Sequence, residues 1–425
     1  MNRLNRRTWT LWLGLLFINA SASAAENYTA NYPNVARQPV DLASSTLGGL
    51  LNGIAAVPVA GSASAASGAP VPFTLSLRGV AANLSGSTAL LGNTTVLNGQ
   101  LAIPSTGANA SFTAPSWPEV VEQIKRFLSQ GAEARRLQRE LARSSPFDPV
   151  AGNPSSLMAR RVAQDFAGAF VPFASNLSEA PVQVAQAGGL PAGAVRGPLP
   201  SLPGAGVQLG LLRDHGRSAK SLTIPLSYTL RSDLDPRRQF SVSLPLTVAD
   251  VDGARTQQGA LAVAMRQPVA RDWALSGNAG FAIVRASDLG SAGKIGSLSL
   301  GSSLVWRGAS SDLVMGNLIG HYRTLGGTVN GFDTGSGISN TVFRNGLLWS
   351  MPAPAWLGFG RSIEYSVVNT HYTGTELYLR NYSELGLNIG SNKRADSTRS
   401  YMQGGLSLLV SAKTTGLVAS YGYWF

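Results

Sequence analysis

Residues 205–425 form a succession of short segments in which apolar and polar residues alternate, with turn residues between them. In one segment Leu222, Ile224 and Leu226 alternate with Thr223 and Pro225. A period of two places alternate residues on opposite faces of a β-strand. Repeated alternating segments of about ten residues are typical of a transmembrane β-barrel. A soluble β-sandwich also alternates, but the inner positions here are polar or glycine, which favours the barrel.

The alternation predicts a mainly β fold with a C-terminal antiparallel barrel of about twelve strands. The candidate strands are Val207–Arg213, Leu222–Arg231, Phe240–Val248, Gly259–Arg266, Trp273–Val284, Ile295–Trp306, Leu313–Tyr322, Thr341–Ser350, Leu357–Asn369, Leu377–Gly390, Tyr401–Val410 and Leu417–Phe425. An even strand number places both ends of a bacterial barrel in the periplasm. Residues 351–355 then lie on a periplasmic turn, and the longest connection, residues 325–339, lies outside.

Composition excludes several classes of protein. Past the leader there is no apolar run of the roughly eighteen residues that a transmembrane helix needs, and mean hydropathy is +0.07. The chain has 0 Cys, which excludes disulfides and thiolate metal sites. The net charge of +12 is dispersed along the chain. We therefore interpret it as lumen, rim and anionic-lipid-facing charge and expect no nucleic-acid partner.

The first residues have the three-part pattern of a secretory signal peptide. Arg3, Arg6 and Arg7 form a positive region, residues 9–18 are apolar, and Ala22-Ser23-Ala24 is a small-residue cleavage site. We expect residues 1–24 to be removed near Ala24. An exported chain that forms a barrel is expected in the outer membrane of a Gram-negative bacterium, in contact with its lipids.

Residues 25–204 are rich in Ala, Gly, Ser and Pro and end in a linker of about residues 187–204. Short alternating pieces within residues 72–113 suggest small hairpins. Helical spacing and an S-x-x-E start at Ser116 predict an amphipathic helix over about residues 116–144. A shorter helix is predicted from Ser156 to about Phe170, with Met158, Val162 and Phe166 aligned.

One face of the longer predicted helix is basic, which allows two interpretations. The face can be solvated while the other face packs, or the helix can lie in or under the barrel as a plug. The basic residues of the possible plug are Lys125, Arg126, Arg135, Arg136 and Arg139.

The last strand carries the most specific single pattern in the chain. Its alternate positions are apolar and aromatic, and we expect them to face lipid, with aromatic side chains near the interface. These positions are Leu417, Ala419, Tyr421, Tyr423 and Phe425.

With a leader, an intermediate region, a helix and a barrel that ends in Tyr-Gly-Tyr-Trp-Phe, the chain resembles an autotransporter or an autotransporter-like solitary outer-membrane barrel. The resemblance covers residues 205–425. It implies that the closing strand is the signal recognised by the barrel-assembly machinery, and that periplasmic chaperones are partners. It further implies translocation or surface display of residues 25–204. The oligomeric state stays open.

Strand parity also predicts charged groups inside the barrel, because the lipid face disfavours charge. The candidate lumen residues are Glu364, Glu376, Arg380 and Glu384. They could line a pore or contact a docked basic helix through Arg135, Arg136 and Arg139. Alternatively, they form a Glu–Arg ladder that fills the interior.

The sequence carries no strong catalytic signature. It has no H-E-x-x-H, P-loop or G-x-S-x-G pattern, so we expect no enzyme, no catalytic residues, no metal site and no cofactor. His371 with Thr373 is the nearest match to the His and Ser of an outer-membrane phospholipase, and a rim histidine is the simpler interpretation. The alternatives to display are a porin-like channel or structural barrel with a periplasmic or plugging N-terminal region, and a barrel-embedded lipid enzyme.

Overall fold

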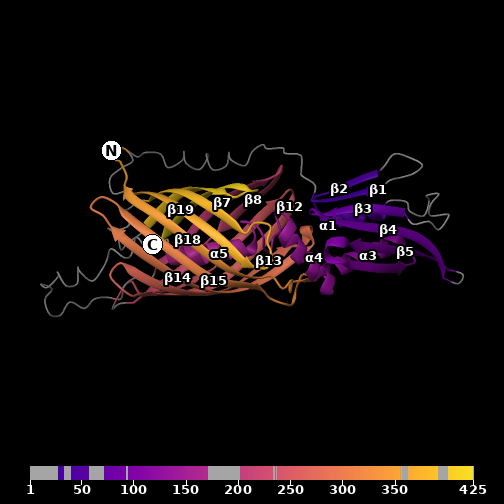
Figure 1. Cartoon of the computed structure of the whole chain (residues 1–425), viewed down its shortest axis with the longest axis horizontal. Coiled ribbons are helices and arrows are strands. Elements are labelled where there is room, and N and C mark those ends of the chain that lie inside the picture. Colours follow the sequence, from indigo (N-terminus) through magenta and orange to yellow (C-terminus); the bar gives the residue numbers. More distant parts are fainter. Residues whose placement is uncertain are drawn as a thin grey trace, which may run out of the picture.

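The computed structural model describes residues 27–32, 40–56, 71–91, 94–170, 202–232, 235, 237–354, 356, 362–390 and 401–424. The predicted signal peptide, most of the predicted linker and Phe425 lie outside these residues. Figure 1 shows the two parts of the chain end to end: a barrel formed by residues 202–424, and a smaller N-terminal domain at one mouth of it.

The barrel closes through its first and last strands. β22 pairs antiparallel with β7, from Thr415 opposite Arg213 to Trp424 opposite Gly204. The barrel segments are β7 (Leu202–Asp214), β8 (Arg217–Ile224), β9 (Leu226–Arg231), β10 (Gln239–Ser243), β11 (Leu246–Val251), β12 (Ala254–Pro268), β13 (Trp273–Ala286), β14 (Ser291–Arg307), β15 (Asp312–Thr324), β18 (Ser339–Pro352), β19 (Ser362–Gly374), β20 (Asn381–Gly390), β21 (Tyr401–Val410) and β22 (Thr415–Trp424).

Two barrel strands are each interrupted once at a proline. β8 and β9 pair with β7 in one continuous register on either side of Pro225. β10 and β11 likewise pair with β12 on either side of Pro245. Proline lacks the N–H group that a ladder hydrogen bond needs. The 14 segments of the sheet therefore make twelve strands, and the predicted fold class is confirmed.

The outer face of the barrel is apolar. On β12 the outward side chains of Leu261, Val263 and Met265 are 52%, 39% and 62% exposed, whereas Ala260 and Ala262 are buried inside. The same alternation of exposed and buried side chains recurs along β15 and β18. A continuous wall of exposed, large apolar side chains is what contact with lipid requires.

The two ends of the barrel differ. We call the end where β7 begins and β22 ends the terminal end, and the opposite mouth, where the N-terminal domain lies, the domain end. The connection after Pro352 lies at the terminal end and residues 325–338 lie at the domain end. The two connections are thus at opposite ends of the barrel, as the order of the predicted strands requires. Outward aromatic side chains gather near the terminal end: Tyr228, Phe240, Trp273, Trp306, Trp349, Tyr365 and Tyr421.

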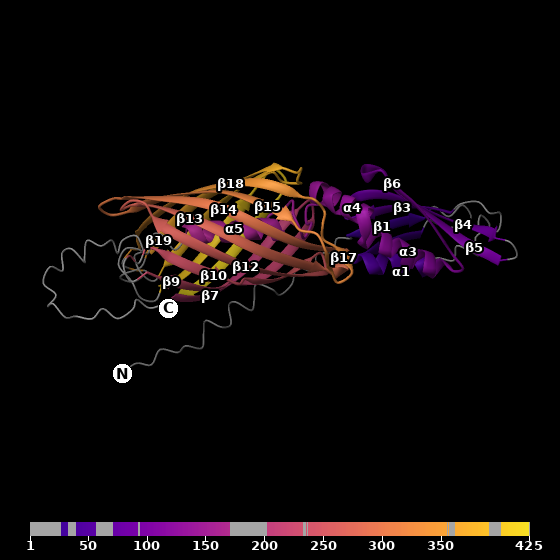
Figure 2. The ribbon, with the colours of Figure 1, turned by 90° about the horizontal axis from the view of Figure 1, so that it is seen from below.

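The N-terminal domain is one antiparallel sheet, in the order β2-β1-β3-β4-β5-β6, with helices over one face (Figure 2). Val71, Phe73 and Leu75 alternate with more exposed neighbours and are buried beneath the helices. The elements are β1 (Tyr28–Tyr32), β2 (Val40–Ser44), α1 (Leu47–Ala56), β3 (Val71–Leu77), β4 (Val80–Leu91), β5 (Thr94–Ile103), β6 (Ala108–Ala114), α3 (Trp117–Ser129) and α4 (Gly131–Ser144). The hairpins expected over residues 72–113 correspond to β3–β6.

The single helix predicted over residues 116–144 is wrong, because the structure has two helices, α3 and α4. Gln130 between them has an extended backbone, with φ −134° and ψ 153°. Gly131 follows with φ +83°, which a residue with a side chain rarely adopts. The predicted start is right: Ser116 precedes α3, and its hydroxyl donates to the Glu119 carboxylate over 2.6 Å.

Candidate functional site in the barrel lumen

Helix α5 (Leu157–Phe170) lies inside the barrel, where it contacts β12, β13, β14, β15 and β18 (Figure 1). The predicted stripe of Met158, Val162 and Phe166 is buried. The chain enters the lumen at the domain end and proceeds toward the terminal end. There Phe166 joins a buried apolar cluster of Ala274, Val305, Val314, Leu318, Leu348 and Val368.

The segment that enters the lumen is fixed by a buried ion pair. Arg78 of the N-terminal domain lies 3.2 Å from the Asp148 carboxylate, and both side chains are buried. The backbone N–H groups of Val150 and Ala151 also donate to Asp148. The Ser156 hydroxyl, just before α5, accepts from the Ala159 N–H at 3.3 Å, which is an N-cap interaction. These contacts therefore fix the start of α5 relative to the N-terminal domain.

A buried polar network joins the middle of α5 to the barrel wall. Arg161, 1% exposed, pairs with Asp165 one turn later on the helix. Its Nε donates to the Ser297 hydroxyl over 3.0 Å. The Tyr322 hydroxyl donates to the other oxygen of Asp165 over 2.8 Å. Because buried charge is costly without partners, this network fixes the rotation of α5 about its own axis and its position along the barrel axis.

Gly280 on β13 makes room for this network. A Cβ atom at this position would lie 2.5 Å from the Arg161 guanidinium. The absence of a side chain therefore lets the guanidinium lie directly against the strand. Gly346 on β18 has the same relation to the Phe166 ring, with a Cβ distance of 2.9 Å.

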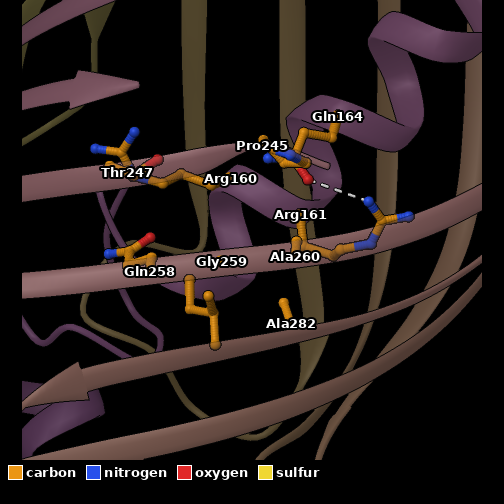
Figure 3. Close-up of a pocket in the computed structure, with 10 residues that line it drawn as sticks. Arg160, Arg161, Gln164, Pro245, Thr247, Gln258, Gly259, Ala260 and Ala282 are labelled. Carbon is orange, nitrogen blue, oxygen red and sulfur yellow. Dashed lines mark hydrogen bonds between the residues drawn. The ribbon is translucent and has the colours of Figure 1, made fainter. Parts of the chain in front are cut away.

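Arg160 and Arg161 leave the helix in different directions (Figure 3). Arg160 Nη1 donates to the Thr223 hydroxyl over 2.9 Å, and its Nε donates to the Ser155 carbonyl. The neighbouring cavity, toward Thr247 and Ala260, has a volume of about 10 Å³. That is roughly the room of one water molecule, so this side of α5 is closely packed against the wall.

Near its C-terminal end, α5 contacts a second charged group on the barrel wall. The Arg344 guanidinium lies 5.0 Å from the centre of the Phe166 ring, a cation–π distance. Two of its nitrogens donate to the two carboxylate oxygens of Glu384, each over 3.0 Å. The Thr370 hydroxyl is a further partner. This bidentate pair spans β18 to β20 across the lumen side of β19.

The structure divides the predicted lumen charges into two groups. Glu364 is buried on the inner side of β19 and accepts from Gln403 over 2.8 Å, and Glu384 pairs with Arg344. Glu376 and Arg380 are 55% and 56% exposed and pair with each other in the connection before β20. The prediction that these two lie in the lumen is therefore wrong.

The error arose because the alternating pattern continues past the start of the strand. β20 begins only at Asn381. Leu377 and Leu379, which alternate with Glu376 and Arg380 and so have the parity of the lipid face in the predicted strand, are each only 5% exposed. The N–H groups of Tyr378 and Leu379 donate to the carbonyls of Ala142 and Gly152. This segment belongs to no strand, and it packs against the N-terminal part of the chain and not against lipid.

Of the two interpretations of the basic helix, the plug is wrong. Its basic residues lie on α3 and α4, in the N-terminal domain outside the barrel, and α5 is the helix that occupies the lumen. Arg135 pairs with Asp333 over 2.7 Å, and Arg139 donates to the Ser336 carbonyl, both in the connection of residues 325–338. Arg136 pairs on its own helix with Glu133, as does Lys125 with Glu122. None of these predicted basic residues pairs with the lumen glutamates in the part of the chain that the structure describes. The carbonyl of Arg126 accepts from the Gln130 N–H and from the Ser129 hydroxyl.

On the closing strand, Leu417 and Tyr421 are 44% and 53% exposed on the outer face, and Ala419 has the same parity. Tyr423 lies on β22, and Phe425 lies outside the described residues. The functional role predicted for this strand stays a prediction.

The histidines lie on the outside of the barrel wall or at its rim. His371 is exposed on β19, and the Thr373 hydroxyl donates to the Thr341 carbonyl. A serine and a histidine from two different strands lie within hydrogen-bond distance: Ser339 Oγ is 3.1 Å from His321 Nε2. His321 Nδ1 lies 3.4 Å from the Thr341 hydroxyl. No group that could hold a metal ion occurs among the described residues.

Sequence reasoning missed Arg161, Asp165 and Tyr322. The signal that could have revealed the first two is their spacing of four residues on an otherwise apolar helix face. Tyr322 is on the inner side of a predicted strand, so the alternating pattern indicates that it faces the lumen, but the pattern does not indicate that it binds Asp165.

None of the described helices is long and apolar enough to cross a membrane.

These features define the class: a closed β-barrel of twelve strands with an apolar outer wall, whose lumen holds a helix of its own chain and which has an N-terminal domain docked at one mouth. No protein-family model matches the chain, and no curated protein matches it.

Several solved barrels are similar in structure. The translocator domain of the autotransporter NalP from Neisseria meningitidis is 11% identical, with a TM-score of 0.38, over 58% of this chain and 96% of that one. The β-domain of the Bordetella autotransporter Brka is 12% identical, with a TM-score of 0.39, over 53% and 98%. An outer-membrane channel from Pseudomonas putida F1 is 11% identical, with a TM-score of 0.38, over 56% and 100%.

Proposed function

We propose that the chain is an autotransporter-like surface-display protein, in which the barrel carries residues 27–144 to the outer face of the membrane and holds them there. One observation carries the proposal: α5 runs through the lumen and joins an N-terminal domain at one mouth to a barrel whose strands begin and end at the other. A chain threaded in this way is what remains when an N-terminal segment has passed outward through its own barrel.

The orientation follows from the even strand number. Both ends of such a barrel lie in the periplasm, so the terminal end faces inward and the domain end faces outward. The domain end also carries the longest described connection, residues 325–338, as expected of outer loops. Its shortest turns, His215-Gly216 and Asp252-Gly253, lie where the domain is docked: Arg217 and Val251 beside them bind Asn27.

Display, and not release, is supported by the contacts between domain and barrel. The Tyr28 hydroxyl donates to the Leu289 carbonyl over 2.8 Å, and Asn27 Nδ2 donates to the Val251 carbonyl over 3.1 Å. On the other side, Arg135 and Arg139 bind residues 333 and 336. The domain is therefore held on both sides of the mouth.

Paired tag insertions test the orientation. A protease-cleavable epitope in the exposed turn of residues 105–107 should be accessible on intact cells. The same epitope in residues 308–311, at the terminal end, should be reached only after the outer membrane is breached. The opposite pattern would show that the domain is periplasmic and that the display function is wrong.

Export and assembly belong to the same proposal. Cleavage near Ala24 would free the mature chain, and periplasmic chaperones and the barrel-assembly machinery would recognise the closing strand. Tyr421→Ser combined with loss of Phe425 should slow assembly. A matched change on the inner side, Ser420→Ala, should not. Equal assembly rates of all three chains would contradict a role for this parity.

We further propose that the protein acts without catalysis, and one pair of residues makes that claim testable. A serine hydroxyl in hydrogen-bond reach of an imidazole can act as a nucleophile with its base. Ser339 and His321 meet this distance condition. In a vesicle-based acyl-ester hydrolysis assay, the purified chain and Ser339→Ala should be equally inactive. Hydrolysis that is lost in Ser339→Ala and kept in Thr373→Ala would instead identify a lipid enzyme.

A further inference from the structure

A belt of basic side chains surrounds part of the outer wall at the domain end. On adjacent strands, the outward apolar series ends in a basic residue at the point where the strand leaves the lipid-facing wall. The residues of this belt are Arg213 on β7, Lys220 on β8, Arg255 on β12, Arg285 on β13, Lys294 on β14 and Arg323 on β15. We call these six residues the basic belt.

The parity of each residue shows that the belt faces outward. Arg255 has the parity of Leu261 and Met265, which are 52% and 62% exposed to the lipid side. Arg285 has the parity of Phe281 on β13, and Arg323 that of Ile319 on β15. The guanidinium groups therefore lie where the apolar wall meets the polar region of the membrane. At that position long basic side chains can extend to phosphate groups.

The belt lies on one side of the barrel and is interrupted at one strand. Its strands are neighbours in the barrel, in the order β7, β8, β11, β12, β13, β14 and β15. The exception is β11, where Asp250 is opposite both Lys220 and Arg255 in the ladder. On the other strands the outward series ends without Lys, Arg, Asp or Glu, for example in Thr341, His371 and Thr415.

The described part of the chain shows no ion pair to any belt residue. Two acidic residues lie beside the belt: Asp250, whose carboxylate accepts from the Gly253 N–H, and Asp288, which accepts from the Arg255 N–H. Arg285 Nε donates to the Ser287 hydroxyl over 3.3 Å. The terminal end differs, because aromatic side chains occupy the corresponding boundary there. Among the described residues, basic side chains therefore occupy the lipid-facing boundary positions at the domain end, whereas the exposed Arg238 and Arg271 at the terminal end lie in connections between strands.

We propose that the basic belt binds the phosphate groups of the phosphorylated glycolipid in the outer leaflet of the outer membrane. The proposal rests on the orientation given under the proposed function, because that orientation places the domain end in the outer leaflet. Several cations along one boundary match a headgroup that carries more than one phosphate, and the apolar wall below them accommodates its acyl chains.

Binding to the full-length chain in detergent micelles tests this proposal, with native mass spectrometry as the readout. The probes are bisphosphorylated lipid A, its dephosphorylated form, phosphatidylglycerol and inorganic phosphate. We expect retention of bisphosphorylated lipid A alone. The triple variant Arg255→Gln, Arg285→Gln, Arg323→Gln should bind it at least about tenfold more weakly.

The matched control is Arg238→Gln with Arg271→Gln, two exposed arginines at the terminal end, which should bind like the unaltered chain. Heat-modifiable gel mobility verifies that every variant forms a barrel. Equal binding by the triple variant, equal binding of dephosphorylated lipid A, or equal retention of phosphatidylglycerol would each overturn the proposal. The outcome is separable from that of the tag insertions, since micelle binding is measured without reference to membrane orientation.

Discussion

The hydroxyl of Tyr322, on the inner wall of β15, donates to the carboxylate of Asp165 on α5 over 2.8 Å. This bond joins two residues 157 positions apart in the sequence. It ties the threaded helix to the barrel in the half nearer the domain end, where Arg161 and Ser297 complete the network. The integrity of the lumen therefore depends on a small set of buried polar groups.

Removing the carboxylate of this network should be strongly destabilising. In Asp165→Ala, the buried guanidinium of Arg161 loses its ion-pair partner, which should cost about 3–5 kcal/mol in the free energy of unfolding. Glu122→Ala breaks the exposed pair with Lys125 and should cost less than about 1 kcal/mol. Denaturant unfolding in detergent measures both. Similar losses in the two variants would contradict the role of the network.

Two glycines on β13 provide a matched pair for the packing of α5. Gly280→Ala places a Cβ within 2.5 Å of the Arg161 guanidinium and should cost about 1–3 kcal/mol through overpacking. At Gly277 the nearest atom to a new Cβ, on Leu300, is 3.9 Å away, so Gly277→Ala should be nearly neutral. Melting temperatures of the two variants compare them directly. A neutral Gly280→Ala would mean that the helix does not lie against this strand.

The lumen should open when α5 is no longer helical. Replacing residues 157–170 by a Gly/Ser chain of equal length removes the buried side chains and keeps the connection. Single-channel conductance in a planar bilayer should then rise. The same replacement of residues 131–144, which form α4 outside the barrel, should leave conductance unchanged. An increase in the second variant alone would support a plug formed by the basic helix.

Docking of the domain should depend on Arg135 and Arg139. Without them, the Asp333 carboxylate loses its ion pair and the Ser336 carbonyl loses its guanidinium donor, and residues 325–338 should become more accessible to hydrogen exchange. Arg136→Ala is the control, since Arg136 pairs with Glu133 on its own helix. Unchanged exchange in Arg135→Ala with Arg139→Ala would show that these contacts do not hold the domain.

The Tyr28 hydroxyl gives docking a predictable alkaline limit. Burial raises the pKa of Tyr28 to about 12, from an ordinary value of 10.0. Because the folded pKa is raised, the stability that its hydrogen bond to Leu289 contributes is fully present below about pH 10. That contribution is lost as the pH rises through about 12. The stability difference between the unaltered chain and Tyr28→Phe should therefore shrink by about 3 kcal/mol over this interval. A pH-independent difference would contradict the buried phenol.

The strands could be predicted because a period of two shows directly that the two faces of a segment have different environments. It does not show whether the apolar face contacts lipid or another part of the protein. Leu377 and Leu379 continue the alternation, yet they pack against the N-terminal part of the chain. The pattern likewise cannot reveal that the helix is broken at Gln130, where α3 has ended and α4 begins at Gly131 with φ +83°. Parity alone predicts that Glu384 faces the lumen, whereas its ion pair with Arg344 can be identified only from the register of the strands.

The lumen helix was harder to predict for a related reason. Residues 156–170 have the apolar spacing of any packed helix, and Arg161 with Asp165 resembles an ordinary surface pair at that spacing. What distinguishes them is the surrounding wall, with Gly280 and Tyr322 supplied by distant strands. The more strongly amphipathic helix was the wrong candidate because a basic face suits solvent and loop carbonyls equally well.

Threading also dictates the order of events during assembly. Six strands side by side extend over roughly 25–29 Å at the usual spacing, whereas an α-helix is about 10–12 Å across. A lumen occupied by one helix therefore could not admit the folded six-stranded sheet. If the domain is displayed as we propose, its polypeptide must cross before that sheet forms, or before β22 meets β7 to close the barrel. Under that proposal, premature folding of residues 27–144 on the inner side of the membrane would arrest the chain, so the display function requires this domain to fold slowly.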